Sequence, residues 1–195
     1  DLSNECRLAE FTSKWANTAI LRNLDRGLVT HLTPINFGGR AVMSGLCLEL
    51  SETQNAIDNC PFSTTYSGDF SVNGVRDQAS ASIGERISWD NIVTAHEIGH
   101  NFSSQHSHCY AGNNNNENPV DACFNEEEGE TCWSGQTSIP GSGSLVGGVP
   151  SIGNGTIMSY CHNLEGGAAN IFQSFGRDFR YGVAPERIPD KMLAF

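Results

Sequence analysis

The stretch HEIGHNFSSQH, residues 96–106, decides the fold of this chain. In a helix, His96 and His100 lie one turn apart on the same face. Two imidazoles at this spacing can bind one metal ion, and Glu97 beside them can hold a water molecule on that ion. The stretch therefore predicts a zinc site of the catalytic kind, in which one coordination position stays open for water.

A helix over residues 90–102 is expected to carry these side chains. Apolar residues recur there at helical spacing, and Asp90 is a residue type that favours the N-cap. A straight helix would carry His106 roughly 15 Å along its axis from His96. The chain must therefore turn back after about Phe102 for His106 to supply the third nitrogen ligand.

A second motif, TIMSY at residues 156–160, lies in the C-terminal half. Together the two motifs resemble those of the metzincin zinc endopeptidases, which combine H-E-x-x-H-x-x-G-x-x-H with a later Met-turn. Within this clan the chain resembles the reprolysin or adamalysin family of secreted proteases, and in particular its non-venom members. The segments that carry the resemblance are AHEIGHNF at residues 95–102, HSHC at 106–109 and GTIMSYCH at 155–162.

The resemblance implies specific roles for Met158 and Tyr160. In metzincins the methionine of the Met-turn lies beneath the three imidazoles as an apolar floor, and Met158 matches it in spacing and local sequence. A tyrosine two residues later can approach the metal and then swing away to stabilise the oxyanion in astacin-like and serralysin-like members. The alternative for Tyr160 is a packed side chain with a hydrogen-bonded hydroxyl.

Ser103 departs from the metzincin pattern, because it stands where the motif has glycine. A helix that ends in a sharp reversal favours a residue with positive φ at this point. A residue other than glycine costs about 1–2 kcal/mol in that region. The backbone of the turn towards His106 is thus expected to be more strained than in other metzincins.

The fold class implied by the resemblance is α+β, a metzincin-like twisted mixed sheet with the zinc-binding helix and an irregular, disulfide-stapled C-terminal subdomain that holds the Met-turn. One catalytic domain would span residues 1–195, with an N-terminal subdomain at 1–106 and a C-terminal subdomain at 107–195. The first strand and helix elements of the family have no counterpart here. We therefore hypothesise that a separate N-terminal fragment or pro-segment completes the sheet.

The elements expected before the zinc-binding helix are one helix and three strands. The helix is predicted over residues 8–24, and the strands over 28–33, 41–50 and 64–72. The resemblance makes residues 41–48 the antiparallel edge strand. A protein or peptide substrate would bind to this edge as an added, extended strand.

Composition and charge indicate one soluble, secreted domain. The chain has 195 residues, of which 38% are hydrophobic, and its formal net charge is −11. This charge argues against nucleic acid and anionic membrane surfaces as partners. No apolar run approaches the roughly 20 residues that a membrane span requires.

Seven cysteines without a C-x-x-C pattern indicate an oxidising, extracellular compartment rather than a thiolate metal site. The resemblance places the third histidine and the Met-turn together, so Cys109–Cys161 is the first disulfide expected. The pairings that close short loops, Cys123–Cys132 and Cys47–Cys60, are expected next. Cys6 would be left over. It would bridge to the missing N-terminal fragment or remain an inert thiol.

The acidic run at residues 126–130, with Asp121, offers a second and weaker metal hypothesis. These carboxylates could hold Ca²⁺, but they lack EF-hand spacing, and a solvated charge run is the favoured interpretation. His108 and His162 lie outside the zinc-ligand pattern. Surface or core roles are therefore expected for both.

The function implied by the resemblance is zinc-dependent endopeptidase activity. Zinc held by His96, His100 and His106 would activate a water molecule, with Glu97 as the general base that takes its proton. One alternative is a catalytically weak or inactive metzincin-like domain that binds zinc or a partner. A chance HExxH in a disulfide-stapled adhesion domain is a third interpretation, but it leaves His106 and Met158 as coincidences.

Overall fold

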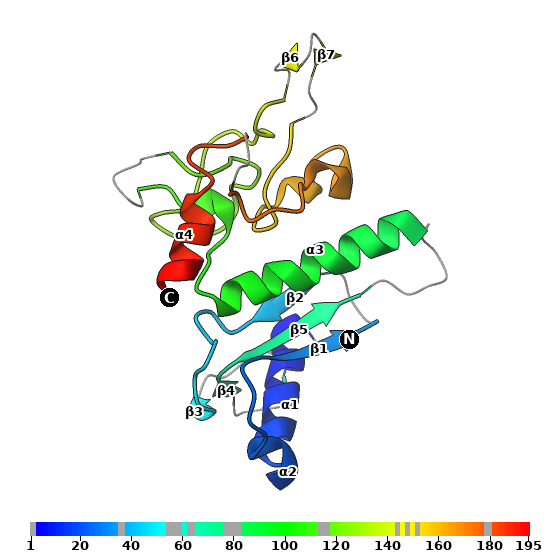
Figure 1. Cartoon of the computed structure of the whole chain (residues 1–195), viewed down its shortest axis with the longest axis vertical. Coiled ribbons are helices and arrows are strands. Elements are labelled where there is room, and N and C mark those ends of the chain that lie inside the picture. The colour runs from blue at the N-terminus through cyan, green and yellow to red at the C-terminus, as the bar shows by residue number, and fades with distance from the viewer. Residues whose placement is uncertain are drawn as a thin grey trace. The chain divides into compact units, whose positions relative to one another are not determined.

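A computed structural model describes residues 3–34, 38–53, 60–61, 65–75, 83–112, 118–142, 145–146, 149–150, 153–177 and 181–195. The chain forms two compact units, Asp1–Ser103 and Ser104–Phe195. The first unit holds the sheet and the long helix α3, and the second holds mostly irregular chain (Figure 1).

A mixed three-stranded sheet forms the first unit's centre. Its strands are β1 (Val29–Thr33), β5 (Phe70–Gly74) and β2 (Gly38–Ala41), in the order β1-β5-β2. β5 runs parallel to β1 and antiparallel to β2. Every residue of β5 is buried, as expected of a central strand that is covered on both faces.

The strand predictions were partly right. β1 confirms the strand expected at residues 28–33, whereas the strand expected at 64–72 is two strands, β4 (Thr65–Ser67) and β5. β4 pairs instead with β3 (Ser51–Thr53) in a separate two-stranded sheet.

The strand predicted over residues 41–50 is wrong. β2 ends at Ala41, because the chain then turns through Ser44 and Cys47, which adopt positive φ values of 57° and 60°. β2 is nevertheless an antiparallel edge strand of the described sheet. The expected edge therefore exists, but a few residues earlier in the chain.

The N-terminal helix is split into α1 (Asn4–Ala16) and α2 (Ala19–Arg22) rather than continuous over 8–24. The α1 N-terminus is capped by Ser3, whose side chain accepts a hydrogen bond from the Cys6 N–H at 3.2 Å. The break follows from two side chains that take over helix carbonyls. Asn17 and Thr18 donate to the carbonyl oxygens of residues 13 and 14, at 2.8 and 2.7 Å.

The long helix α3 (Ile83–Asn101) packs against β5 and β2. It begins seven residues before Asp90, so the prediction of an N-cap there is wrong. In the sequence, Ile83 and Ile87 extend the apolar spacing upstream, and the helix follows them. None of the described helices is both long and apolar enough to cross a membrane.

The second unit has little regular structure. Its elements among the described residues are η1 (Ser107–Cys109), β6 (Leu145–Val146), β7 (Val149–Pro150), η3 (Cys161–Asn163), η4 (Gly167–Asn170) and α4 (Arg187–Ala194). Buried Arg187 organises the C-terminus by donating to the carbonyl oxygens of Tyr110, Asn118 and Val183 at 2.9, 3.0 and 2.8 Å. These side-chain hydrogen bonds satisfy loop carbonyls that strand pairing would satisfy in a sheet.

The disulfides are Cys6–Cys60, Cys109–Cys132 and Cys123–Cys161, and Cys47 is an exposed free thiol. All three predicted pairings were wrong. Cys6 lies on the buried face of α1, where it meets Cys60, so it is not available for a bond to another chain. The two motifs predicted that the segments of Cys109 and Cys161 lie close together. Closeness of two segments does not decide which sulfur atoms face each other.

Candidate active site

Helix α3 presents His96 and His100 side by side. Their ring centroids are 4.8 Å apart with an interplanar angle of 84°, and both side chains are buried. This is the geometry that the spacing of four residues predicts. The structure thus brings together, within the first unit, the first two candidate ligands.

Glu97 is buried beside them, and the edge strand β2 passes close to it. Burial raises the pKa of Glu97 to about 8, although nearby Arg40 acts in the opposite direction. A Cβ atom added at Gly39 would lie 2.5 Å from the Glu97 Cγ and 2.6 Å from its Oε1. Glycine at this position therefore leaves the space that the carboxyl group occupies.

The C-terminal end of α3 is fastened to the loop that follows β2. The fully buried Asn101 side chain donates to the carbonyl oxygens of Val42 and Phe70 at 3.0 and 3.1 Å. The Ser44 N–H donates to the His100 carbonyl at 2.9 Å. These contacts fix the helix turn that carries His100.

Ser103 adopts the left-handed conformation that glycine favours, with φ of 70°. Its N–H donates to the His100 carbonyl at 2.9 Å, and its hydroxyl accepts from the Ser44 hydroxyl at 3.0 Å. The helix therefore ends in the same reversal that glycine would provide. Ser44 supports a serine in that place.

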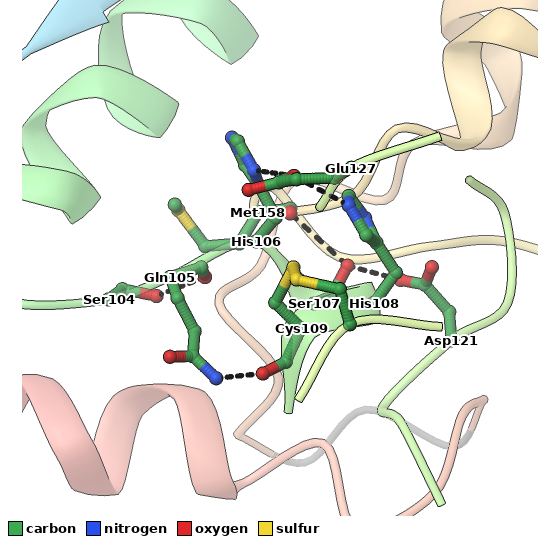
Figure 2. Close-up of polar contacts among 10 residues, drawn as sticks. Ser104, Gln105, His106, Ser107, His108, Cys109, Asp121, Glu127 and Met158 are labelled. Atoms are coloured by element: carbon green, nitrogen blue, oxygen red, sulfur yellow. Dashed lines mark hydrogen bonds and ion pairs between the residues drawn. A yellow bond between two sulfur atoms is a disulfide. The ribbon is translucent and has the colours of Figure 1, made fainter. Parts of the chain in front are cut away.

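His106 lies in the second unit, where a carboxylate holds it. The Glu127 Oε2 atom is 2.6 Å from His106 Nδ1 and 2.7 Å from His108 Nε2 (Figure 2). Burial would raise the pKa of Glu127, but the hydrogen bonds from both imidazoles outweigh this effect and lower it. Glu127 is thus a carboxylate that accepts two hydrogen bonds at one oxygen.

Met158 lies in a turn that is bonded to the residue after His106. The Ser159 N–H donates to the Thr156 carbonyl at 3.0 Å, so Met158 occupies the third position of a four-residue turn. The Met158 carbonyl accepts from the Ser107 N–H at 2.9 Å and from its hydroxyl at 3.1 Å. Met158 is fully buried.

Asp121 also belongs to this hydrogen-bond network. It is buried and accepts a hydrogen bond from the Ser107 hydroxyl (Figure 2). It accepts a second hydrogen bond from the Cys123 N–H at 3.1 Å. Burial raises the pKa of Asp121 despite these hydrogen bonds. Asp121 also lines a cavity of about 420 Å³ together with Val120 and Trp133.

Tyr160 packs against the imidazole of His106. The two ring centroids are 4.4 Å apart, and Tyr160 also contacts Phe124 at 5.0 Å and His108 at 5.3 Å. The ring is half-buried. Both predicted roles of Tyr160, packing and chemistry at the metal, begin from such a position, and the choice between them stays a prediction.

The donor set fits zinc. Neutral imidazoles are typical zinc ligands, and zinc-bound histidines commonly donate their other ring N–H to a carboxylate. Glu127 stands in that relation to Nδ1 of His106. A proton on Nδ1 leaves the lone pair of the neutral ring on Nε2, the atom suited to ligate a metal.

Sequence reasoning missed the contacts of Glu127 with His106 and His108. The acidic run was interpreted as solvated or as a calcium site, and no observation tests the calcium hypothesis. Of the surface and core roles expected for His108, the core role is confirmed, because its side chain is fully buried. The one signal available was the alternation His-x-His at residues 106–108, which places two imidazoles close together.

A helix that carries two adjacent imidazoles and a buried carboxyl group, packed on a small mixed sheet, is an arrangement that metallopeptidases use. The family model Reprolysin_5, of metallo-peptidase family M12, matches residues 2–171, so the chain belongs to this family. The predicted reprolysin-like metzincin is thereby confirmed. Among curated proteins, none matches the chain.

Proposed function

We propose that this protein is a secreted zinc endopeptidase in which His96, His100 and His106 ligate the metal and Glu97 is the general base. The observation that carries the proposal is the pair of adjacent imidazoles on α3 with the buried Glu97 between them in sequence. His106 joins them in the proposal because it completes the family's motif six residues after His100.

The chain's own residues supply proton transfer and substrate binding. When bound, zinc provides Lewis-acid chemistry, by polarising a water molecule and the peptide carbonyl. Glu97 takes a proton from the attacking water as the water oxygen bonds to the peptide carbonyl carbon. Glu97 then gives this proton to the leaving nitrogen as the peptide C–N bond breaks. A zinc ion bound near Glu97 would favour the carboxylate form of Glu97, which is the form that a general base requires.

β2 is the proposed substrate-binding edge. It is an edge strand of the described sheet, and its residue Gly39 lies against Glu97. A peptide that adds to this edge as an antiparallel strand places its backbone next to the general base. This arrangement favours extended protein segments as substrates.

Met158 and Tyr160 are assigned supporting roles. Met158 is proposed as the apolar floor below the ligands, which agrees with its complete burial and its bonds to Ser107. Tyr160 is proposed to stabilise the oxyanion, and its contact with the His106 ring supports this assignment.

We also propose the compartment in which the enzyme acts and the fragment that completes its sheet. Three disulfides in a chain of 195 residues favour secretion. A separate N-terminal fragment or pro-segment would complete the sheet at β1, the opposite edge from β2 among the described strands. Intact mass and N-terminal sequencing of the natural protein test this part, and a natural protein that contains only this chain would contradict it.

The catalytically inactive alternative remains untested. It rests partly on Ser103 in the glycine position, and Ser103 adopts the positive φ that the turn requires. Serine is therefore compatible with the helix end on which His106 depends.

Cleavage of casein by the purified chain, before and after a chelator, tests the proposal. We expect activity that the chelator removes and added zinc restores. Glu97→Gln should retain zinc and lose most turnover, whereas His100→Ala should lose zinc as well. Normal cleavage by the Glu97→Gln variant would contradict the assignment of the general base.

A further inference from the structure

We propose that Glu127 is a positioning residue for the metal ligand His106, and that His108 holds Glu127 in place. This inference rests on the proposed function, because it assumes that His106 binds zinc. It assigns a role to one member of the acidic run that the sequence alone left as solvated charge. It also assigns a role to a histidine outside the ligand pattern.

The geometry puts Glu127 between the two imidazoles. A single oxygen, Oε2, is 2.6 Å from His106 Nδ1 and 2.7 Å from His108 Nε2. The rings are stacked, with an interplanar angle of 15° and centroids 5.4 Å apart. Hydrogen bonds to a carboxylate are stronger than those between neutral groups, so this oxygen fixes the orientation of both rings.

The exposed fractions of the three side chains indicate that the surrounding protein fixes His108 and that contacts with His108 hold Glu127. The His108 side chain is 0% exposed, that of His106 is 15% exposed, and that of Glu127 is 34% exposed. A glutamate at a partly exposed site would sample several rotamers. The buried His108 limits Glu127 to the rotamer that reaches His106.

The tautomers follow from the same contacts. An ionised carboxylate only accepts, so His106 donates from Nδ1 and His108 donates from Nε2. The lone pair of His106 is then on Nε2, which a zinc ion requires. His108 Nδ1 has no hydrogen-bond partner among the described residues, so the hydrogen bond to Glu127 is the one that compensates its burial.

Two disulfides hold the segment that carries Glu127. Cys123 and Cys132 flank it, and they are bonded to Cys161 and Cys109. Cys109 follows His106 by three residues, and Cys161 follows Met158 by three. The segment is therefore tied at both ends to the two chain stretches that the site uses.

The acidic run itself supplies a matched control. Glu126 and Glu128 are exposed, whereas Glu127 is half-buried, and all three carry the same charge. Replacing Glu126 by Gln changes the net charge as much as replacing Glu127 does. A difference between the two variants thus reports the contacts of Glu127 rather than the charge of the run.

The test is the zinc dissociation constant, measured by competition with a chromophoric chelator for wild type, Glu127→Gln and Glu126→Gln. We expect Glu127→Gln to weaken zinc binding by about 10–100-fold, the usual effect of losing a carboxylate partner of a ligating histidine. Glu126→Gln should bind zinc like wild type. Unfolding of the zinc-free proteins provides the structural readout, since a merely structural residue would change stability and leave the affinity of the folded protein unaltered.

A double-substitution cycle tests the part assigned to His108. His108→Gln keeps an N–H donor and should retain most of the affinity, whereas His108→Leu should weaken zinc binding. In the Glu127→Gln background, His108→Leu should add little, because both residues act through one contact. Full additivity of the two effects would overturn the coupling.

The outcomes separate this inference from the proposed function. If wild type binds zinc and cleaves casein while Glu127→Gln keeps wild-type affinity, the positioning inference fails and the proposed function stands. If wild type binds no zinc, both fail. The ligand atoms of His106, His108 and Glu127 lie within 4.8 Å of one another, so they could themselves bind an ion. Two zinc ions per wild-type chain, falling to one in Glu127→Gln, would overturn positioning in favour of a second metal site.

Discussion

Ser103 offers a test of the turn between α3 and His106. Its φ of 70° lies in the left-handed region, which glycine adopts freely and other residues do not. We compare Ser103→Gly with Ser103→Ala, because both variants lose the hydrogen bond from Ser44. Their difference in the free energy of unfolding therefore isolates the backbone conformation.

The magnitude follows from two opposing terms. Alanine in the left-handed region costs about 1–2 kcal/mol more than glycine, and the greater freedom of glycine in the unfolded chain offsets about 0.4–1 kcal/mol of this. Ser103→Gly should thus be more stable than Ser103→Ala by about 0.8 kcal/mol, the difference between the midpoints of these two ranges. For a chain of this size, each kcal/mol corresponds to roughly 2–4 °C in the unfolding temperature.

Ser13 is the matched control, since it lies within α1 at an ordinary helical position of the same unit. There the order should reverse, with alanine more stable than glycine by about 1 kcal/mol. Urea unfolding followed by circular dichroism measures all four variants. Equal stability of the two Ser103 variants, or alanine ahead of glycine at both positions, would refute the left-handed assignment.

Three further predictions concern other parts of the structure. Gly39→Ala should lower turnover by about 100-fold with zinc content retained, because the added Cβ would displace the Glu97 side chain. Normal turnover by this variant would contradict the close approach of β2 to Glu97. Burial raises the pKa of Asp121, so the folded state binds the Asp121 proton more tightly than the unfolded state does. The stability that this proton binding provides is present below about pH 4 and is lost as pH rises. Asp121→Asn should therefore lose less stability than wild type between pH 4 and pH 7 in urea titrations, and parallel pH profiles would contradict this. Native, unreduced protein should react with one equivalent of a maleimide reagent, at Cys47, and a chain with Cys47→Ser should react with none.

The sequence predicted those parts of the local geometry that depend on residue spacing. His96 and His100 follow from helical periodicity, and the turn at Met158 follows from a contiguous motif. The start of α3 was misplaced, because Asp90 is a good cap by residue type while the apolar spacing continues upstream to Ile83. Residue type alone could not decide between capping and continuation.

Long-range pairings were beyond the sequence. The disulfides depend on which cysteines face each other after folding, and Cys6 meets Cys60 across 54 residues. Glu127 likewise reaches His106 across 21 residues, from a run in which its neighbours carry the same charge. Without coordinates, nothing distinguishes one glutamate of that run from the next.

The most direct test of the central claim is X-ray absorption at the zinc edge of the zinc-loaded chain. Ligation by His96, His100 and His106 predicts one zinc ion whose first shell holds three imidazole nitrogens at about 2.0–2.1 Å and one oxygen. A first shell of sulfur atoms at about 2.3 Å, or a chain that retains no zinc after dialysis, would contradict the claim.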